Sequence, residues 1–134
     1  MIVTVTLLDG LVLAQSAVHH SVNYRSVVVR GRAHLVREEA TKTSALDAIL
    51  DRAASGRSAD CRPATAKELA STAVLALALD EVSAKVRDGG VEDEPEDMAL
   101  PYWAGVVPLR QVAGAPEPDP KLPAEIPVPA YLAE

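Results

Sequence analysis

Two adjacent histidines are the residues of this chain best suited to proton chemistry. Histidine is the side-chain type that ordinarily exchanges a proton near neutral pH, so His19 or His20 could give a proton to a substrate. His20 is the candidate catalytic residue. In an extended segment neighbouring side chains point to opposite sides, so at most one of the two faces a pocket. The alternative interpretation is an exposed pair in a loop.

Polar residues that follow the histidines could bind an anion or a ring edge. Arg25 carries a guanidinium, which pairs well with phosphate, while Asn23 and Ser26 could hydrogen-bond a ring. Farther along, Lys85 and Arg87 fall on one face of a predicted strand and could attract an anionic ligand. The simpler interpretation of each is turn or surface polarity.

A metal site is not predicted. The adjacent histidines lack the usual spacing of metal ligands, and His34 and Cys61 lie in no helical or Cys-x-x-Cys pattern. Cys61 is the single cysteine, so it forms no internal disulfide. No motif around it marks it as a nucleophile.

The elements that position these residues begin with strands. Residues 3–8 and 11–16 are apolar and flank Asp9-Gly10, a dipeptide typical of a tight hairpin turn. Residues 24–36 form a long β-type run with Gly31 inside it, where glycine often marks a bulge or bend. The sequence therefore predicts a hairpin followed by a bent strand.

Two helices are predicted next. Residues 38–53 place apolar side chains on one helical stripe. Thr65-Ala66-Lys67-Glu68 is a capping box, which predicts a short helix to about Ser71. Residues 72–79 are continuously apolar and predict a buried strand, with an extension of the helix as the alternative.

The remaining elements are strands and a proline-rich tail. Residues 81–87 alternate between apolar and polar and predict a half-exposed strand, and residues 103–112 predict a last strand interrupted by Pro108. Six of the ten prolines lie after residue 113: Pro116, Pro118, Pro120, Pro123, Pro127 and Pro129. We therefore expect a domain over residues 1–113 and an extended C-terminal arm over residues 114–134.

Composition excludes several classes of partner. Hydrophobic residues make up 49% and charged residues 24% of the chain, which is typical of a soluble globular protein. The net charge of −6 argues against nucleic acid and anionic membranes, since both bind basic surfaces. There is neither an apolar run of about 18 residues nor a basic signal-peptide start. The predicted location is the cytoplasm.

Two segments resemble a known family. Residues 19–33 (HHSVNYRSVVVRGRA) and 100–109 (LPYWAGVVPL) resemble the pyridoxamine 5'-phosphate oxidase-like superfamily, and residues 83–87 extend the resemblance. Within it the chain looks closest to the flavin-nucleotide-binding branch that includes the nitroimidazole-resistance proteins. The resemblance implies a mainly β (α+β) fold, a split β-barrel with two helices between strands. It also implies a homodimer that holds FMN in two clefts at the interface.

The resemblance further implies roles for individual residues. The strand from Tyr24 to Gly31 would lie beside the flavin, with Arg25 and Ser26 on its ring or phosphate edges. The strand with Trp103 would close the cleft from the partner subunit, while the two histidines lie in the loop leading into the flavin strand. The implied cofactor-binding set is His19, His20, Asn23, Tyr24, Arg25, Ser26, Lys85 and Trp103.

The chain departs from the family pattern at its start. In the family several strands, and a basic or Ser-rich segment that grips the FMN phosphate, precede the position that matches Met1. We therefore expect the first strands of the domain and the phosphate clamp to be missing. The chain would then be a fragment, as from a misplaced start codon, or its fold would be rebuilt by partner swapping. The edge of residues 3–8 would then be uncovered unless another chain pairs with it.

Two functions follow from these observations. One is an FMN-dependent oxidoreductase acting on a small molecule such as a nitro-aromatic, in which the cofactor carries the electron chemistry. The alternative is a non-catalytic or incomplete split-barrel module that dimerises and does not hold flavin by itself. A deazaflavin or heme in place of FMN is a third possibility within the same fold.

Overall fold

The computed structural model describes residues 1–132 as a mixed α and β chain, consisting mainly of antiparallel strands with two α-helices. The chain forms two units: one contains residues 1–32 and 78–112, the other residues 33–77 and the segment from residue 113 onward. No helix among the described residues is long and apolar enough to cross a bilayer. The elements are β1 (Ile2–Leu13), β2 (Ser21–Arg30), β3 (His34–Leu35), α1 (Glu39–Ala53), α2 (Ala66–Ser71), β4 (Leu75–Ala76), β5 (Glu81–Arg87) and β6 (Gly105–Pro108), with short 3-10 turns at Arg57–Asp60, Asp97–Ala99 and Ala130–Leu132.

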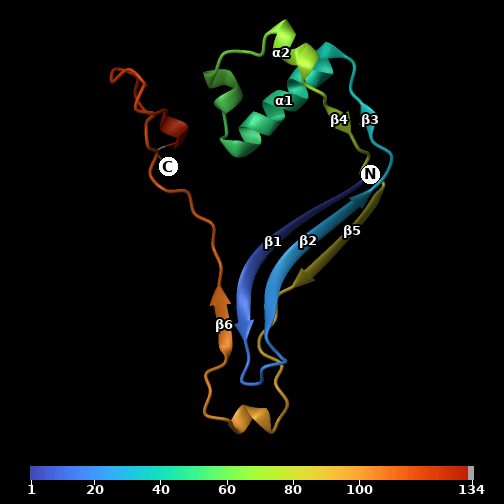
Figure 1. Cartoon of the computed structure of the whole chain (residues 1–134), viewed down its shortest axis with the longest axis vertical. Helices are drawn as coiled ribbons and strands as arrows, with labels where there is room; N and C mark the ends of the chain where they lie inside the picture. The colour runs from blue at the N-terminus through green and yellow to red at the C-terminus, as the bar shows by residue number, and fades with distance from the viewer. Residues whose placement is uncertain (133–134) are drawn as a thin grey trace. The chain divides into compact units, whose positions relative to one another are not determined.

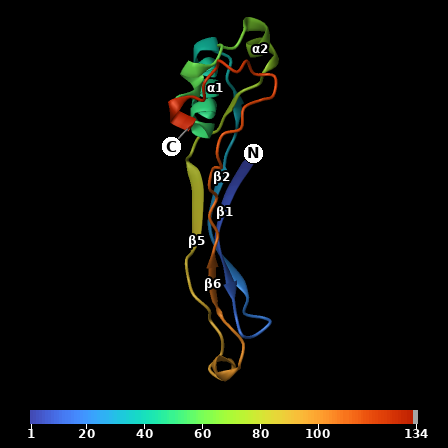
Figure 2. The same ribbon diagram turned by 90° about the vertical axis from the view of Figure 1, so that its left-hand side faces the viewer.

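The first unit is a four-stranded antiparallel sheet in the order β5-β2-β1-β6 (Figure 1). The strands β1 and β2 pair along most of their length, from Ile2 opposite Arg30 to Val12 opposite Ser21. The other edge of β2 pairs with all of β5, so β2 lies between β1 and β5 in both views (Figure 2). These strands are rich in Val and Thr, whose branched side chains fit a pleated surface.

The predicted hairpin at Asp9-Gly10 is wrong, because this pair lies inside one continuous strand. Pairing between β1 and β2 shifts by one residue between Leu8 and Gly10, which makes the site a β-bulge. The strand β2 offers a partner along nearly all of β1, so a bulge preserves more of the ladder than a turn does. A Cβ on Gly10 would lie 3.1 Å from the Val106 side chain. Glycine therefore lets β6 approach closely here.

Three further strand predictions are corrected by the structure. The predicted run 24–36 ends at Arg30 with a bend at Gly31, and His34–Leu35 belongs to another sheet. The predicted strand 72–79 is reduced to Leu75–Ala76, where Leu75 is exposed. The last strand covers only Gly105–Pro108, because proline has no N–H with which to continue a ladder.

The second unit contains both predicted helices and a small sheet. The helix α1 lies within the predicted range 38–53, and α2 begins after Thr65 with the predicted capping box. The strands β3 and β4 pair as a two-stranded antiparallel sheet. In the tail, the Tyr131 hydroxyl donates to Asp60 at 2.8 Å. The division of the chain at residue 113 into a domain and an arm stays a prediction.

The apolar core is small for a chain of this length. Only Val12, Ala14 and Leu69 are buried apolar residues among those described. The surface area is 10779 Å², whereas a compact protein of this mass exposes roughly 6,700 Å². Even two separate globules of half the mass would expose only about 8,100 Å². Much apolar surface therefore lies uncovered, and closure of the sheet into a barrel stays a prediction.

Candidate functional site

The two faces of the sheet differ in chemistry. Residues directly opposite each other on antiparallel strands share a face, and alternate residues along a strand change face. One face carries rows such as Val3, Val29 and Val82, and then Val5, Val27 and Ala84. The other face carries a polar row of Thr6, Ser26 and Lys85. We call these the apolar face and the polar face.

The polar row joins three strands at the middle of the sheet. Thr6 of β1 and Ser26 of β2 lie with their hydroxyl oxygens 2.8 Å apart. Lys85 of β5 stands opposite Ser26 on its other side, and among residues 1–132 it forms no ion pair. Two hydroxyls and a free ammonium group in one row can donate several hydrogen bonds to a phosphate or another anion.

Side chains next to this row extend the polar face. Tyr24 lies one row away on the same face, and Ser83 lies one row away on the other side. A shallow hollow of about 290 Å³ follows, lined by Val28, Arg30, Glu81, Val82 and Ser83. The structure thus brings three predicted cofactor residues, Tyr24, Ser26 and Lys85, to one face of the sheet.

Arg25 lies on the opposite face from these three residues. Its guanidinium donates two hydrogen bonds to the Asp9 carboxylate, at 2.9 and 2.8 Å. This pairing lowers the pKa of Asp9 and raises that of Arg25. Asp9 and Arg25 line a groove of about 630 Å³ beside β1, and Arg110 lines it as well. Arg25 is therefore occupied by a carboxylate rather than presented to the polar face.

Asn23 holds the end of β5 in place. Its side-chain amide donates to the Gly89 carbonyl at 2.9 Å and accepts from the Gly89 N–H at 3.1 Å. Arg87 also donates to the Asn23 carbonyl oxygen, at 2.7 Å. Asn23 is only 5% exposed. These bonds engage both the oxygen and the nitrogen of the Asn23 amide, so the residue has a structural role. A contact between Asn23 and a cofactor stays a prediction.

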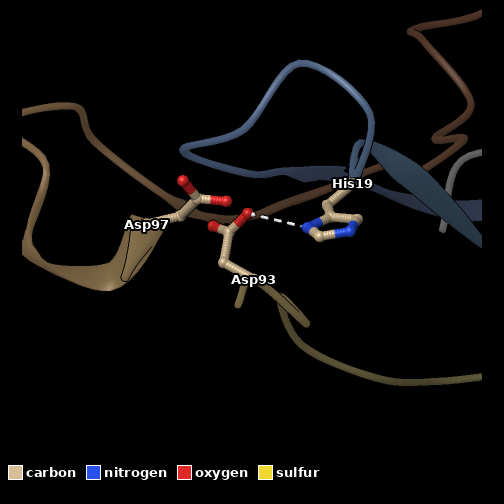
Figure 3. Close-up of side chains that lie close together, drawn as sticks. All are labelled: His19, Asp93 and Asp97. Carbon is tan, nitrogen blue, oxygen red and sulfur yellow. Dashed lines mark hydrogen bonds and ion pairs between the residues drawn. The ribbon is translucent and has the colours of Figure 1, made fainter. Parts of the chain in front are cut away.

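His19 lies where two loops meet, residues 14–20 and residues 88–104. Its Nδ1 is 3.3 Å from the carboxylate of Asp93, and the carboxylate of Asp97 is nearby (Figure 3). One ligand atom from each of the three residues lies within 4.8 Å of the others. His20 instead directs Nδ1 to the Ser16 carbonyl, at 3.1 Å. The two histidines thus contact different partners.

Trp103 precedes β6 and is not in a strand. Its ring lies over Gly105, where an added Cβ would come within 2.8 Å of the ring. The side chain is 66% exposed, so it is not a core anchor in this chain. An exposed indole is available to wall a flat ligand or to contact a partner, and closure of a flavin cleft by Trp103 stays a prediction.

Sequence reasoning missed several residues of these sites, including Thr6 of the polar row. Asp9 is predicted only as part of a turn and Asp93 is not singled out, yet Asp9 holds Arg25 and Asp93 holds His19, both of the predicted set. Arg110 was assigned no role. Arg87 was noted only for its charge, whereas it bonds Asn23. The pairs Asp9–Arg25 and His19–Asp93 are 16 and 74 residues apart, and no local signal in the sequence could have found them.

Comparisons with known proteins identify the family. The family model for pyridoxamine 5'-phosphate oxidase matches residues 1–86. The flavocytochrome Anf3 from Azotobacter vinelandii is similar over 98% of this chain and 61% of its own, with 44% identity and a TM-score of 0.89. An FAD- and heme-binding protein from Mycobacterium smegmatis is similar over 97% and 64%, with 42% identity and a TM-score of 0.89.

The similarity covers nearly all of this chain but only part of each solved relative. The chain spans less than two thirds of the length of either solved relative. No curated protein matches it. The family match nevertheless covers the strands β1 and β2, the two helices and nearly all of β5, which together contain the polar row. The chain therefore belongs to the pyridoxamine 5'-phosphate oxidase family.

Proposed function

We propose that this chain binds a flavin nucleotide and is the flavin-holding part of an oxidoreductase. The observation that carries the proposal is the polar row of Thr6, Ser26 and Lys85 on one sheet face. Membership of the family and similarity to a flavocytochrome and to an FAD- and heme-binding protein support it. The row would hold the flavin phosphate.

Side chains have to supply most of the phosphate contacts at this position. The backbone N–H and C=O groups of β2 are engaged on both edges by the ladders to β1 and β5. A phosphate on this face would therefore be bound by the Lys85 ammonium and the two hydroxyls. Hydrogen bonds to a charged partner are worth about 1.5–3 kcal/mol each, more than neutral ones.

Two flavin nucleotides fit the proposal. The resemblance pointed to FMN, while one similar structure is an FAD-binding protein. Both nucleotides carry a phosphate on the ribityl chain, so the polar row serves either one. The flavin supplies hydride or electron chemistry, and the chain's own residues bind and orient it. We infer a small-molecule substrate and a homodimer.

The decisive measurement is flavin affinity in a variant that removes the ammonium group. We expect Lys85→Gln to weaken binding of added flavin by about 10–100-fold, the factor that corresponds to losing one charged hydrogen bond. Lys67→Gln is the matched control, because Lys67 is exposed on α2 outside this sheet. Quenching of flavin fluorescence gives the affinity, and chromatography of the released cofactor distinguishes FMN from FAD.

The proposal fails on two results. Wild-type protein that takes up neither flavin rules out the function for this chain. Wild-type binding that Lys85→Gln and Lys67→Gln weaken to the same small extent rules out the polar row as the anchor, while leaving flavin binding elsewhere open to mapping.

A second candidate function is a dimerisation module without catalysis. The observation that favours it is the exposed apolar face, with Val3, Val5, Val27, Val82 and Val86 all partly or largely accessible. An exposed apolar area of this kind marks an interaction site on a soluble protein. The flavin titration separates the two functions, because a module of this kind associates with itself and takes up no cofactor.

A further inference from the structure

Three side chains that can bind a metal ion converge where the loops of residues 14–20 and 88–104 meet (Figure 3). One ligand atom of each of His19, Asp93 and Asp97 lies within 4.8 Å of the others, and Nδ1 of His19 is 3.3 Å from Oδ1 of Asp93. A first-row metal ion with bonds of about 2.1 Å holds neighbouring ligand atoms about 3–3.4 Å apart. The His19–Asp93 pair therefore already has the spacing of two ligands on one ion, and the Asp97 carboxylate lies beside it.

Asp93 is fixed in position by the backbone of the neighbouring loop. Its side chain is 2% exposed, and its carboxylate accepts hydrogen bonds from the backbone N–H of Gln15 at 2.7 Å and of Ser16 at 3.2 Å. The side-chain amide of Gln15 donates to the carbonyls of Leu100 at 2.8 Å and Tyr102 at 3.1 Å, which joins the two loops a second time. Outer hydrogen bonds of this kind orient the ligands of a metal site. The two loops therefore hold Asp93 in a ligand's position in advance.

The charge around these residues favours a cation. The loop of residues 88–104 contains six carboxylates and no lysine or arginine, and the loop of residues 14–20 contains no basic residue other than its two histidines. Among residues 1–132, Arg87 pairs with Glu92 at 3.8 Å, while neither Asp93 nor Asp97 pairs with a lysine or an arginine. Two carboxylates this close repel each other unless a positive charge lies between them. A divalent cation supplies that charge.

The donor set selects the kind of cation. An imidazole nitrogen suits Zn²⁺ and other transition metals, whereas Ca²⁺ and Mg²⁺ take oxygen ligands. Carboxylates in place of thiolates argue against Cu⁺. Three protein ligands with a water molecule in the remaining position are a common set for Zn²⁺. An ion at Nδ1 of His19 takes the place of the proton shared with Asp93, and the ring proton then lies on Nε2.

The other nitrogen and sulfur ligands of the chain do not join this cluster. His20 is exposed, and its Nδ1 lies 3.1 Å from the Ser16 carbonyl. His34 and Cys61 belong to the second unit. Within the described residues, the three-residue cluster at His19 is the one group of histidine, cysteine and carboxylate side chains with the spacing of metal ligands.

We propose that His19, Asp93 and Asp97 bind a Zn²⁺ ion through Nδ1 and one oxygen of each carboxylate. One loop joins β1 to β2 and the other joins β5 to β6, so the ion clips together the connections at one end of the sheet. It stabilises the folded chain, because the three ligands meet only when both loops are in place. The site lies apart from the polar row and does not depend on flavin being bound.

The test is calorimetric titration of the full chain with Zn²⁺ after treatment with a chelator. Asp97→Asn is the informative variant, because it removes one charged ligand and leaves the contact between His19 and Asp93 in place. We expect one Zn²⁺ per chain in wild type and an affinity at least about tenfold lower in Asp97→Asn. Asp88→Asn is the matched control, since it removes the same charge from the same loop outside the cluster, and it should keep the wild-type affinity.

Thermal unfolding gives a second readout. Added Zn²⁺ should raise the Tm of wild type and of Asp88→Asn by the same amount, and that of Asp97→Asn by less, because an ion that binds only the folded chain stabilises it by mass action. Mg²⁺ at the same concentration should leave all three Tm values unchanged, since the imidazole selects against it.

Each other outcome overturns the proposal. A wild-type chain that takes up no Zn²⁺ contradicts it, and equal weakening by Asp97→Asn and Asp88→Asn shows only general attraction to an acidic surface. Loss of binding in Cys61→Ser with retention in Asp97→Asn assigns the ion to the second unit. If Asp97→Asn proves unfolded by circular dichroism, His19→Gln repeats the test, and wild-type affinity in that variant counts against the site. Flavin uptake, measured separately, reports on the polar row alone.

Discussion

Individual residues in this protein divide into those that hold the frame and those left free to bind. The side chains of Asn23, Asp93 and Asp9 form hydrogen bonds with other parts of the chain. Lys85 forms no ion pair among residues 1–132. Free polar groups beside satisfied ones are what a binding site needs, because the satisfied groups fix the geometry in advance.

Asn23→Ala should destabilise the sheet by about 1–3 kcal/mol, because it leaves partly buried polar groups of Gly89 and Arg87 without partners. The side chain is buried and bonded to the N–H and C=O of one residue and to a guanidinium. The urea midpoint of unfolding measures the change. Gln111→Ala, at an exposed amide, is the control, and equal midpoints for the two variants would contradict the structural role of Asn23.

Residue roles were predictable from the sequence only where the contact is local. The two histidines and Ser26 attracted attention through their types and through the family resemblance. Their partners did not, because the pair His19–Asp93 is made across 74 residues and Thr6–Ser26 across 20. Such contacts depend on strand register and on how loops meet. Arg25 illustrates the limit, since alternation along β2 places it on the face opposite Ser26.

At the scale of elements, signals within one turn were read correctly. The capping box at Thr65 is present with both reciprocal bonds, and α1 ends at the predicted Ala53. The Asp9-Gly10 signal failed because β2 pairs with residues on both sides of it, so a long-range ladder outweighs a local turn preference. The apolar run 72–79 failed for a related reason, since only two of its residues find a partner strand.

The capping box gives the helix α2 a defined pH dependence. Hydrogen bonds from Arg62 and then from Thr65 lower the pKa of Glu68 from 4.5 to about 2. Because the folded pKa is the lower one, the stabilisation by Glu68 is present above pH 4.5 and is lost as the pH falls toward 2. We expect the unfolding midpoint to fall with pH across this window in wild-type protein and to fall less in Glu68→Gln.

The comparison needs a carboxylate that does not cap a helix. Glu125→Gln, in the tail, should keep the wild-type slope of midpoint against pH. Parallel slopes for wild type and Glu68→Gln between pH 4.5 and 2 would show that the Glu68 contacts do not contribute to stability. Salt should weaken the effect, since the Arg62–Glu68 pair is exposed and screened by ions.

For the molecule as a whole, the amount of buried apolar surface depends on the topology of the sheet more than on composition. A chain with 49% hydrophobic residues is able to form a sizeable core, yet only three apolar residues are buried in the part of the chain that the structure describes. The reason is that β1, β2 and β5 place most of their valines on one face, and no other described element of that unit covers it. The surface exceeds that of two separate globules of half the mass by roughly 2,700 Å².

That excess is large enough for a stable interface, which buries about 800 Å² on each partner. We therefore expect the chain to associate with itself through the apolar face, in line with the proposed homodimer. Val5→Lys places a charge on this face, directly opposite Val27 and one row away from Val3. It should shift the sedimentation coefficient toward that of a monomer and raise the dissociation constant by at least about tenfold.

Thr4→Lys is the matched control, because Thr4 is the neighbouring residue on the same strand and points to the opposite face. It adds the same charge and side-chain length without entering the apolar face, so its sedimentation should match that of wild type. Equal dissociation by Val5→Lys and Thr4→Lys would implicate net charge or the strand edge instead. A wild-type chain that sediments as a monomer at all concentrations would contradict association through this face.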